Sequence, residues 1–247
     1  MTDTYFWALA LAVIIGFMLG TLGSGGSIIT FPALVYVAHV EPRSAVGMSM
    51  AIVGVTSLAA AFLHWRRGNF HLKAALLLGL SGMAGAYLGS AFTHAVSPTA
   101  LMLLFGALML VVGVLMLAGV LERLNRGRCR PLRCVITGAA VGVLTGFLGV
   151  GGGFLIVPAL IVFAGLDTRL AVGTSVGIIA INSLSGLAGQ LRFTHFDWPL
   201  TLLFIVLALA GMAWGLAIAR RLDDSALRKG FAVLLLLVGV GIAGLNL

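Results

Sequence analysis

The stretch Leu22-Gly23-Ser24-Gly25-Gly26 recurs 126 residues later as Leu148-Gly149-Val150-Gly151-Gly152. In both places it interrupts an apolar run, and in both it is followed by Pro-Ala-Leu and then by Ala-Val-Gly-x-Ser. Residues 20–49 and 146–175 share 14 identities in 30 positions. The identities include Gly, Pro, Arg and Ser, so a shared apolar composition does not explain them. Self-similarity at a fixed spacing indicates internal duplication.

The composition places this duplicated chain in a membrane. Of its 247 residues, 61% are hydrophobic and 9% are charged, and the mean hydropathy is +1.16. A helix needs about 20 apolar residues to cross a bilayer, and in lipid a helix satisfies its own backbone groups. The sequence therefore predicts an all-α polytopic membrane protein with about ten segments, some of them short or broken at the glycine stretches. The expected segments are 5–22, 27–40, 45–65, 74–93, 100–120, 135–149, 153–166, 171–191, 199–219 and 228–246.

The expected organisation is a first repeat over 1–120, a basic cytoplasmic linker over 121–134 and a second repeat over 135–247. Five segments in each half would insert the second half upside down. With both termini outside, most Lys and Arg residues fall in inside loops, as the positive-inside rule requires. The equivalent loops 66–73 and 192–198 also differ in their content of basic residues. We therefore predict two five-segment inverted repeats in a bacterial-type inner membrane.

A second arrangement stays open at this point. If 27–40 and 153–166 re-enter the membrane without crossing it, each half crosses four times and the repeats are parallel. Basic loops would then lie on both sides of the membrane.

Charge and motif content exclude several classes of protein. The net charge of +8 comes from basic residues that gather in short connections between apolar runs, so we expect no nucleic-acid partner. No Asp or Glu lies within an expected segment, which argues against a carboxylate-driven cation antiporter. We find no nucleotide-binding or catalytic motif, and expect no enzyme activity, cofactor or metal. Cys129 and Cys134 lie in the basic linker and are interpreted as free thiols of a reducing compartment.

The glycine breaks are the first candidate site. Irregular backbone at membrane depth is tolerated where it lines a cavity, and the helix that follows begins with free N–H groups and a positive dipole end. Such an end binds anions. The alternative is close helix packing, which we expect for the scattered glycines Gly82, Gly85 and Gly89. Pro32 and Pro158 are assigned structural roles, because proline kinks a helix.

Polar side chains on the helices after each break complete the candidate site, although they could equally be helix caps or packing hydroxyls. Arg192 would attract anions, or anchor its helix at the interface. The expected substrate-binding residues are Gly23, Ser24, Gly25, Gly26, Ser27, Ser49, Gly149, Gly151, Gly152, Gly153, Thr174, Ser175, Asn182, Gln190 and Arg192.

These paired motifs resemble the sulfite exporter TauE/SafE family of membrane transporters. The resemblance extends over nearly the whole chain, and the second copy is the more typical. In the first copy, Ser27 and Met48 stand where the second has Gly153 and Thr174, which weakens the case for two equal half-sites. The resemblance implies export or uptake of sulfur-containing anions such as sulfite or organosulfonates.

Together these observations predict a secondary transporter of a small anion that works by alternating access around the glycine breaks. Its expected partners are the anion and the lipid bilayer, and a homo-oligomer stays open. The alternatives are a passive anion channel and, from another class, an intramembrane thiol redox protein.

Overall fold

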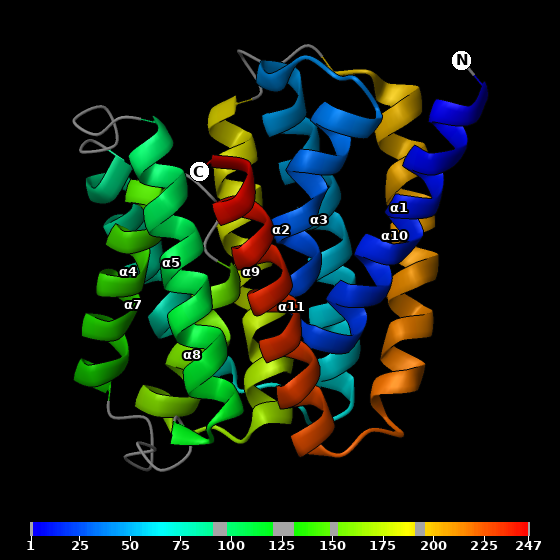
Figure 1. Cartoon of the computed structure of the whole chain (residues 1–247). Coiled ribbons are helices and arrows are strands. Elements are labelled where there is room, and N and C mark those ends of the chain that lie inside the picture. The colour runs from blue at the N-terminus through cyan, green and yellow to red at the C-terminus, as the bar shows by residue number, and fades with distance from the viewer. Residues whose placement is uncertain (1, 91–97, 121–130, 149–152, 191–195, 247) are drawn as a thin grey trace. The chain divides into compact units, whose positions relative to one another are not determined.

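The structure is a computed structural model that describes residues 2–90, 98–120, 131–148, 153–190 and 196–246 (Figure 1). This part of the chain contains ten α-helices and one π-helix, and no strand. In chain order the elements are α1 (Thr2–Leu22), α2 (Gly25–Pro32), η1 (Ala33–Val37), α3 (Pro42–Arg66), α4 (Leu72–Ser90), α5 (Pro98–Leu117), α7 (Pro131–Leu148), α8 (Gly153–Ala164), α9 (Thr168–Gln190), α10 (Trp198–Ala219) and α11 (Asp224–Asn246).

With α2 and η1 taken together, each helical segment coincides with one expected apolar segment to within about four residues, and the all-α prediction is confirmed. Among the described residues, four helices are long and apolar enough to cross a bilayer: α3, α9, α10 and α11. The remaining apolar helices contribute apolar stretches of 10–17 residues among the described residues. The chain is a multi-pass membrane protein.

The chain divides into two compact units, and each takes residues from both halves of the sequence. Unit 1 comprises Met1–Phe70 and Val172–Arg221, and unit 2 comprises His71–Ala171 and Leu222–Leu247. The first glycine break therefore lies in unit 1 together with most of α9, which belongs to the second half of the sequence.

Glycines bring helices of unit 1 into backbone contact. A Cβ on Gly16 of α1 would overlap the carbonyl oxygen of Ala208 in α10, and a Cβ on Gly211 of α10 would overlap that of Val13. A Cβ on Gly20 of α1 would likewise overlap the carbonyl oxygen of Met212. From Gly16 to Gly20 the partner moves from Ala208 to Met212, so α1 and α10 run in parallel. Small residues permit this approach, which supplies dispersion contacts in lipid where the hydrophobic effect between helices is absent. Beside this pair, Phe204, Leu34 and Met48 form a core with no solvent exposure.

Unit 2 contains a second parallel pair and one antiparallel pair. A Cβ on Gly138 of α7 would lie 2.8 Å from the carbonyl oxygen of Leu78 in α4, and one on Gly142 would overlap that of Gly82, so α4 and α7 run in parallel. A Cβ on Gly85 would overlap the carbonyl oxygen of Ala139. The packing role expected for Gly82 and Gly85 is confirmed, and Gly89 has no described side-chain surroundings. In the α5 and α11 pair, a Cβ on Gly113 would lie 3.0 Å from Leu236, and one on Gly239 would lie 3.1 Å from Leu110.

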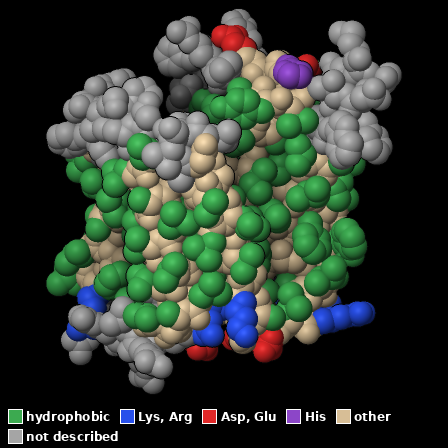
Figure 2. All heavy atoms as spheres, viewed as in Figure 1, with side chains coloured by type: hydrophobic (Ala, Val, Ile, Leu, Met, Phe, Trp, Pro, Cys, Tyr) green, Lys and Arg blue, Asp and Glu red, His purple; other side chains and the backbone are tan. Residues whose placement is uncertain are grey.

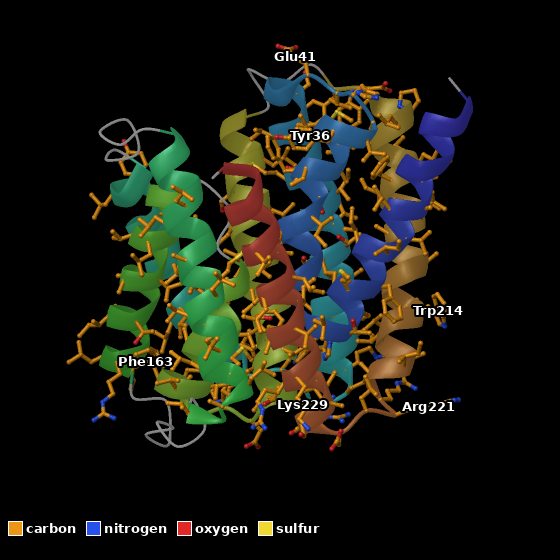
Figure 3. The ribbon with its side chains drawn as sticks, viewed as in Figure 1. Tyr36, Glu41, Phe163, Trp214, Arg221 and Lys229 are labelled. Carbon is orange, nitrogen blue, oxygen red and sulfur yellow. The ribbon has the colours of Figure 1, made fainter. Side chains whose placement is uncertain are left out.

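The outer faces of the helices are apolar and their ends carry the charges. Large hydrophobic side chains such as Trp214 (61% exposed) and Leu58 (54% exposed) point away from the core, as Figure 2 shows for one face. In unit 1, Arg221 and Glu41 lie at opposite ends of the helices, and Trp214 projects outward between them (Figure 3). Burial, together with the positive charge of Arg220, lowers the pKa of Arg67, so basic groups crowd where α3 and α10 end.

The interpretation of the cysteines as free thiols is wrong for Cys134. Cys134 is fully buried near the start of α7 and is disulfide-bonded. Cys129 lies outside the described residues. The sequence did not predict the disulfide bond, because two cysteines separated by four residues match neither a CxxC redox motif nor a typical disulfide framework.

A candidate anion site at the first glycine break

The break between α1 and α2 is a turn that glycine makes possible. Gly23 has φ +79°, a left-handed conformation that L-residues with a Cβ avoid. Its N–H donates to the Leu19 carbonyl at 3.0 Å and closes the end of α1, and the Ser24 N–H donates to the Leu22 carbonyl at 3.1 Å. The chain reverses within these two residues, and α2 begins at Gly25.

The α2 helix then returns along α1 at very short range. A Cβ on Gly26 would overlap the carbonyl oxygen of Ile15 and lie 2.8 Å from the Leu19 Cβ. Gly25 and Gly26 are both buried. The close packing of α2 on α1 is therefore sufficient to explain why residue 26 is a glycine, whether or not Gly26 also binds a solute.

Pro32 ends the regular α-helical hydrogen bonding of α2. The next five residues form η1, and the Ala38 N–H donates to the Ala33 carbonyl at 3.0 Å, five residues back. Proline has no N–H to donate and its ring crowds the preceding turn, which is one origin of such single-turn π segments. Pro158 differs, because α8 continues through it from Gly153 to Ala164 as one α-helix.

Gly23 packs against α9, so the break of the first half meets the Ala-Val-Gly-x-Ser motif of the second. A Cβ on Gly23 would lie 2.8 Å from the Ser175 Oγ and 3.0 Å from the Val172 carbonyl oxygen. Ser175 and Thr174 are fully buried, and the Ser175 hydroxyl donates to the Val172 carbonyl at 2.8 Å. The structure therefore brings Gly23, Ser24 and Ser175 together within unit 1.

Among the described residues of unit 1, three serine and asparagine side chains each carry a buried polar atom with no hydrogen-bond partner. These atoms are the Ser24 Oγ, the Ser57 Oγ and the Asn182 Oδ1. Ser24 is the N-cap residue of α2 and is fully buried, yet its side chain makes no capping hydrogen bond. The neighbouring Ser27 hydroxyl, by contrast, donates to the Ser24 carbonyl at 2.7 Å. A buried hydroxyl without a partner costs free energy, and a bound water or ion is one usual explanation for such a group.

Ser57 and Asn182 come from α3 and α9, which pack in opposite directions. A Cβ on Gly54 would lie 3.5 Å from the Ser183 Cβ, and one on Gly186 would lie 3.0 Å from the Met50 Sδ. Residue numbers therefore increase along α3 as they decrease along the facing side of α9, so the two helices are antiparallel. Ser57 and Asn182 lie within about one helical turn of each other along the helix axes. Ser57 was not among the predicted site residues, although its match to Ser183 across the duplication was a signal for it.

The other predicted residues are more scattered. The Ser49 hydroxyl donates to the Val46 carbonyl at 2.8 Å in its own helix, and Gly153 is buried at the start of α8, in unit 2. Gln190 is the last residue of α9, and its side chain is not described. Gly149, Gly151, Gly152 and Arg192 lie outside the described residues.

Apart from His64 of α3, which is buried beside Gly173 of α9, the polar groups of this region are neutral hydrogen-bonding groups. No Lys, Arg, Asp or Glu occurs in 4–40, 44–65 or 170–191 of the sequence. Within the part of the chain that the structure describes, no group of three or more His, Cys, Asp or Glu side chains lies close enough to hold a metal ion. Hydroxyls, an amide and the first backbone N–H groups of α2 are the groups available to a solute.

Comparison with known proteins gives the family. The model of the sulfite exporter TauE/SafE family matches residues 8–242. A probable membrane transporter protein of Xylella fastidiosa is 37% identical over 241 residues, which cover 92% of this chain and 90% of the relative. The probable membrane transporter protein YdhB of Bacillus subtilis is 28% identical over 204 residues, covering 80% of this chain and 83% of YdhB. The chain is a membrane transporter and not an enzyme, and it belongs to the sulfite exporter TauE/SafE family.

Proposed function

We propose that the protein is a secondary transporter of a small anion, and that a sulfur-containing oxyanion or organosulfonate is its cargo. The observation that carries this proposal is the buried Ser24 hydroxyl, which has no partner and lies at the start of α2 against α9. The matching family is described as sulfite exporters, which supports the choice of cargo.

The local chemistry favours an anion over a cation. The first N–H groups of a helix have no intrahelical partner, and they carry the positive end of the helix dipole. The Ser24 hydroxyl adds a donor at the same place. Acidic side chains, which cation sites at membrane depth use, do not occur in the segments that form this region.

Helix boundaries support the proposal that the chain is built from two five-segment repeats. The starts of α3 and α9 are Pro42 and Thr168, those of α4 and α10 are Leu72 and Trp198, and those of α5 and α11 are Pro98 and Asp224. The differences are 168 − 42, 198 − 72 and 224 − 98, and each equals 126. This is the same spacing that aligns the glycine breaks.

Contacts between helices repeat with the same spacing. Gly16 meets Ala208 in unit 1, and residues 126 positions away, Gly142 and Gly82, meet in unit 2. Gly113 meets Leu236, and Gly239 meets Leu110. Gly239 is the position 126 residues after Gly113, and Leu110 is the position 126 residues before Leu236, so the second contact is the counterpart of the first with the two helices exchanged. Reciprocal contacts of this kind are the mark of a twofold relation, here between two halves of one chain.

Helix directions favour inverted over parallel repeats. Equivalent helices α3 and α9 pack antiparallel in unit 1, and equivalent helices α5 and α11 pack antiparallel in unit 2. If α2 and α8 re-entered without crossing, an even number of crossings would separate the members of each pair, and they would run in parallel. The antiparallel packing supports five crossings per half, the arrangement in which inverted repeats rock around a central site.

The loop charges support a topology with both termini outside. Arg67, Arg220 and Arg221 lie where α3 and α10 end, and Lys and Arg residues are retained on the cytoplasmic side. The disulfide at Cys134 points the other way, because disulfides persist in oxidising compartments. Single cysteines in place of Glu41 and Arg221, in a chain without its native cysteines, decide this. We expect a membrane-impermeant maleimide to label position 41 from outside and position 221 from inside.

Transport in proteoliposomes tests the function. Vesicles loaded with methanesulfonate or sulfite should exchange them for external label, and the flux should saturate and accelerate when the same anion is present on the opposite side. Gly25→Leu should abolish this exchange, because Gly25 is buried at the start of α2. Gly241→Leu is the control, since nothing lies within 4 Å of a Cβ there. Flux without saturation or exchange would make the protein a channel, and undiminished exchange by a folded Gly25→Leu variant would refute the site.

A further inference from the structure

The unpartnered serine and asparagine groups of α2, α3 and α9 named above carry no formal charge, and a titratable side chain packed among these helices is the buried His64 of α3, beside Gly173 of α9. Ser24 and Ser57 offer hydroxyls, Asn182 offers an amide, and α2 offers backbone N–H groups. An amide supplies both donors and an acceptor, and a hydroxyl supplies one donor. The charged residues nearest in the sequence to Ser24 are Glu41 and Arg43, and neither lies on α2. No Lys or Arg of 4–40, 44–65 or 170–191 therefore balances the charge of a bound anion.

This absence of countercharge limits how much negative charge the site can hold. The cost of moving an ion from water into a low-dielectric interior is large unless an opposite charge compensates it. In a continuum description this cost rises with the square of the charge, so a dianion loses about four times as much solvation as a monoanion of equal size. A helix start contributes only about half an elementary charge.

From this balance we propose that the site selects monoanions and rejects dianions of similar shape. The inference rests on the proposed transport function and deepens it by naming the charge state of the cargo. A monoanion receives hydrogen bonds from the helix start and the two hydroxyls, and the Asn182 Oδ1 can also accept a hydrogen bond from a protonated oxygen or an amino group of the solute. A dianion would retain an uncompensated charge.

Competition in proteoliposomes tests this selectivity. The purified full-length protein exchanges labelled methanesulfonate, and unlabelled anions compete with it. Methanesulfonate is a monoanion throughout the neutral pH range and sulfate is a dianion there. We expect unlabelled methanesulfonate to compete at least about tenfold more strongly than sulfate, a difference that corresponds to a single factor of ten in the dissociation constant.

Sulfite provides a test within one compound, because it changes from monoanion to dianion in the neutral pH range. Its competition should weaken as the pH rises, in proportion to the loss of the monoanion, and the exchange of methanesulfonate against itself should stay constant. The constant exchange controls for any titration of the protein.

The side chains are tested by Ser24→Ala and Ser57→Ala, each of which removes one unpartnered hydroxyl. Each should weaken methanesulfonate competition by about three- to tenfold, the range for one hydrogen bond. Ser81→Ala is the matched control, since the Ser81 hydroxyl donates to the Leu77 carbonyl of its own helix in unit 2, and its affinity should be unchanged.

The outcomes separate the two proposals. Equal competition by sulfate and methanesulfonate, or sulfite competition that does not fall with rising pH, would overturn the selectivity and leave anion transport intact. Unchanged affinity in both serine variants would overturn the assignment of the site. Absence of exchange with every anion would refute the transport function itself.

Discussion

The close contact between α1 and α10 predicts a specific cost for one added methyl group. In Gly16→Ala the new Cβ would overlap the Ala208 carbonyl oxygen, far inside the 3.4–4 Å of ordinary van der Waals contact. The neighbour is backbone and cannot rotate away, so the helices must separate. Overpacking of this kind costs about 1–3 kcal/mol, and the better helix propensity of alanine returns up to about 1 kcal/mol. We expect a net loss of about 1–2 kcal/mol.

The assay is thermal unfolding of the purified protein in detergent, followed by circular dichroism. At roughly 2–4 °C per kcal/mol for a chain of this size, the melting temperature should fall by about 2–8 °C. The melting temperature of the Gly142→Ala variant should fall by a similar amount, because a Cβ there meets the Gly82 carbonyl in the equivalent way. Gly241→Ala is the control, with nothing within 4 Å of its Cβ, and should be unchanged or slightly more stable. If Gly16→Ala melts no lower than Gly241→Ala, the packing argument is refuted.

Three further predictions concern the same unfolding measurement. Asp197→Ala should cost about 1 kcal/mol, because the Asp197 Oδ1 caps α10 by accepting the Leu200 N–H at 3.1 Å, whereas Asp197→Asn should cost much less; equal losses would exclude the cap. Phe204→Ala should cost about 3–5 kcal/mol because Phe204 is fully buried and its removal leaves a cavity, and the exposed Trp214→Ala provides the comparison. Arg169→Gln should cost less than about 1 kcal/mol, because the Arg169–Asp224 ion pair is 3.3 Å long and half exposed; a larger loss that salt does not reduce would point instead to its hydrogen bond with the Leu222 carbonyl.

The boundaries of the helices followed from local properties of the sequence. Apolar length sets the extent of a membrane helix, and glycine and proline interrupt it wherever they occur. Pro42, Pro98 and Pro131 accordingly stand at helix starts, where proline is tolerated. The likeness of residues 20–49 to 146–175 was visible for the same reason, since it is a property of residue order and does not depend on contacts.

The disulfide at Cys134 and the identity of the unpartnered polar atoms were beyond the reach of the sequence. The hydroxyls of Ser24 and Ser27 look equivalent in sequence, yet the Ser27 hydroxyl donates to the Ser24 carbonyl and the Ser24 hydroxyl has no partner. The difference depends on how the chain turns at Gly23.

The sequence by itself determined that the chain is a membrane protein, where its helices begin and end, and that its two halves are alike, because hydropathy, backbone propensity and duplication are carried by neighbouring residues. Only the tertiary structure decided that the first break packs on the second half's α9 and that equivalent helices run antiparallel. Both depend on contacts between residues more than 100 positions apart, such as Gly23 with Ser175 and Gly54 with Ser183. No local pattern specifies such contacts, because they arise only when small residues allow distant backbones to meet.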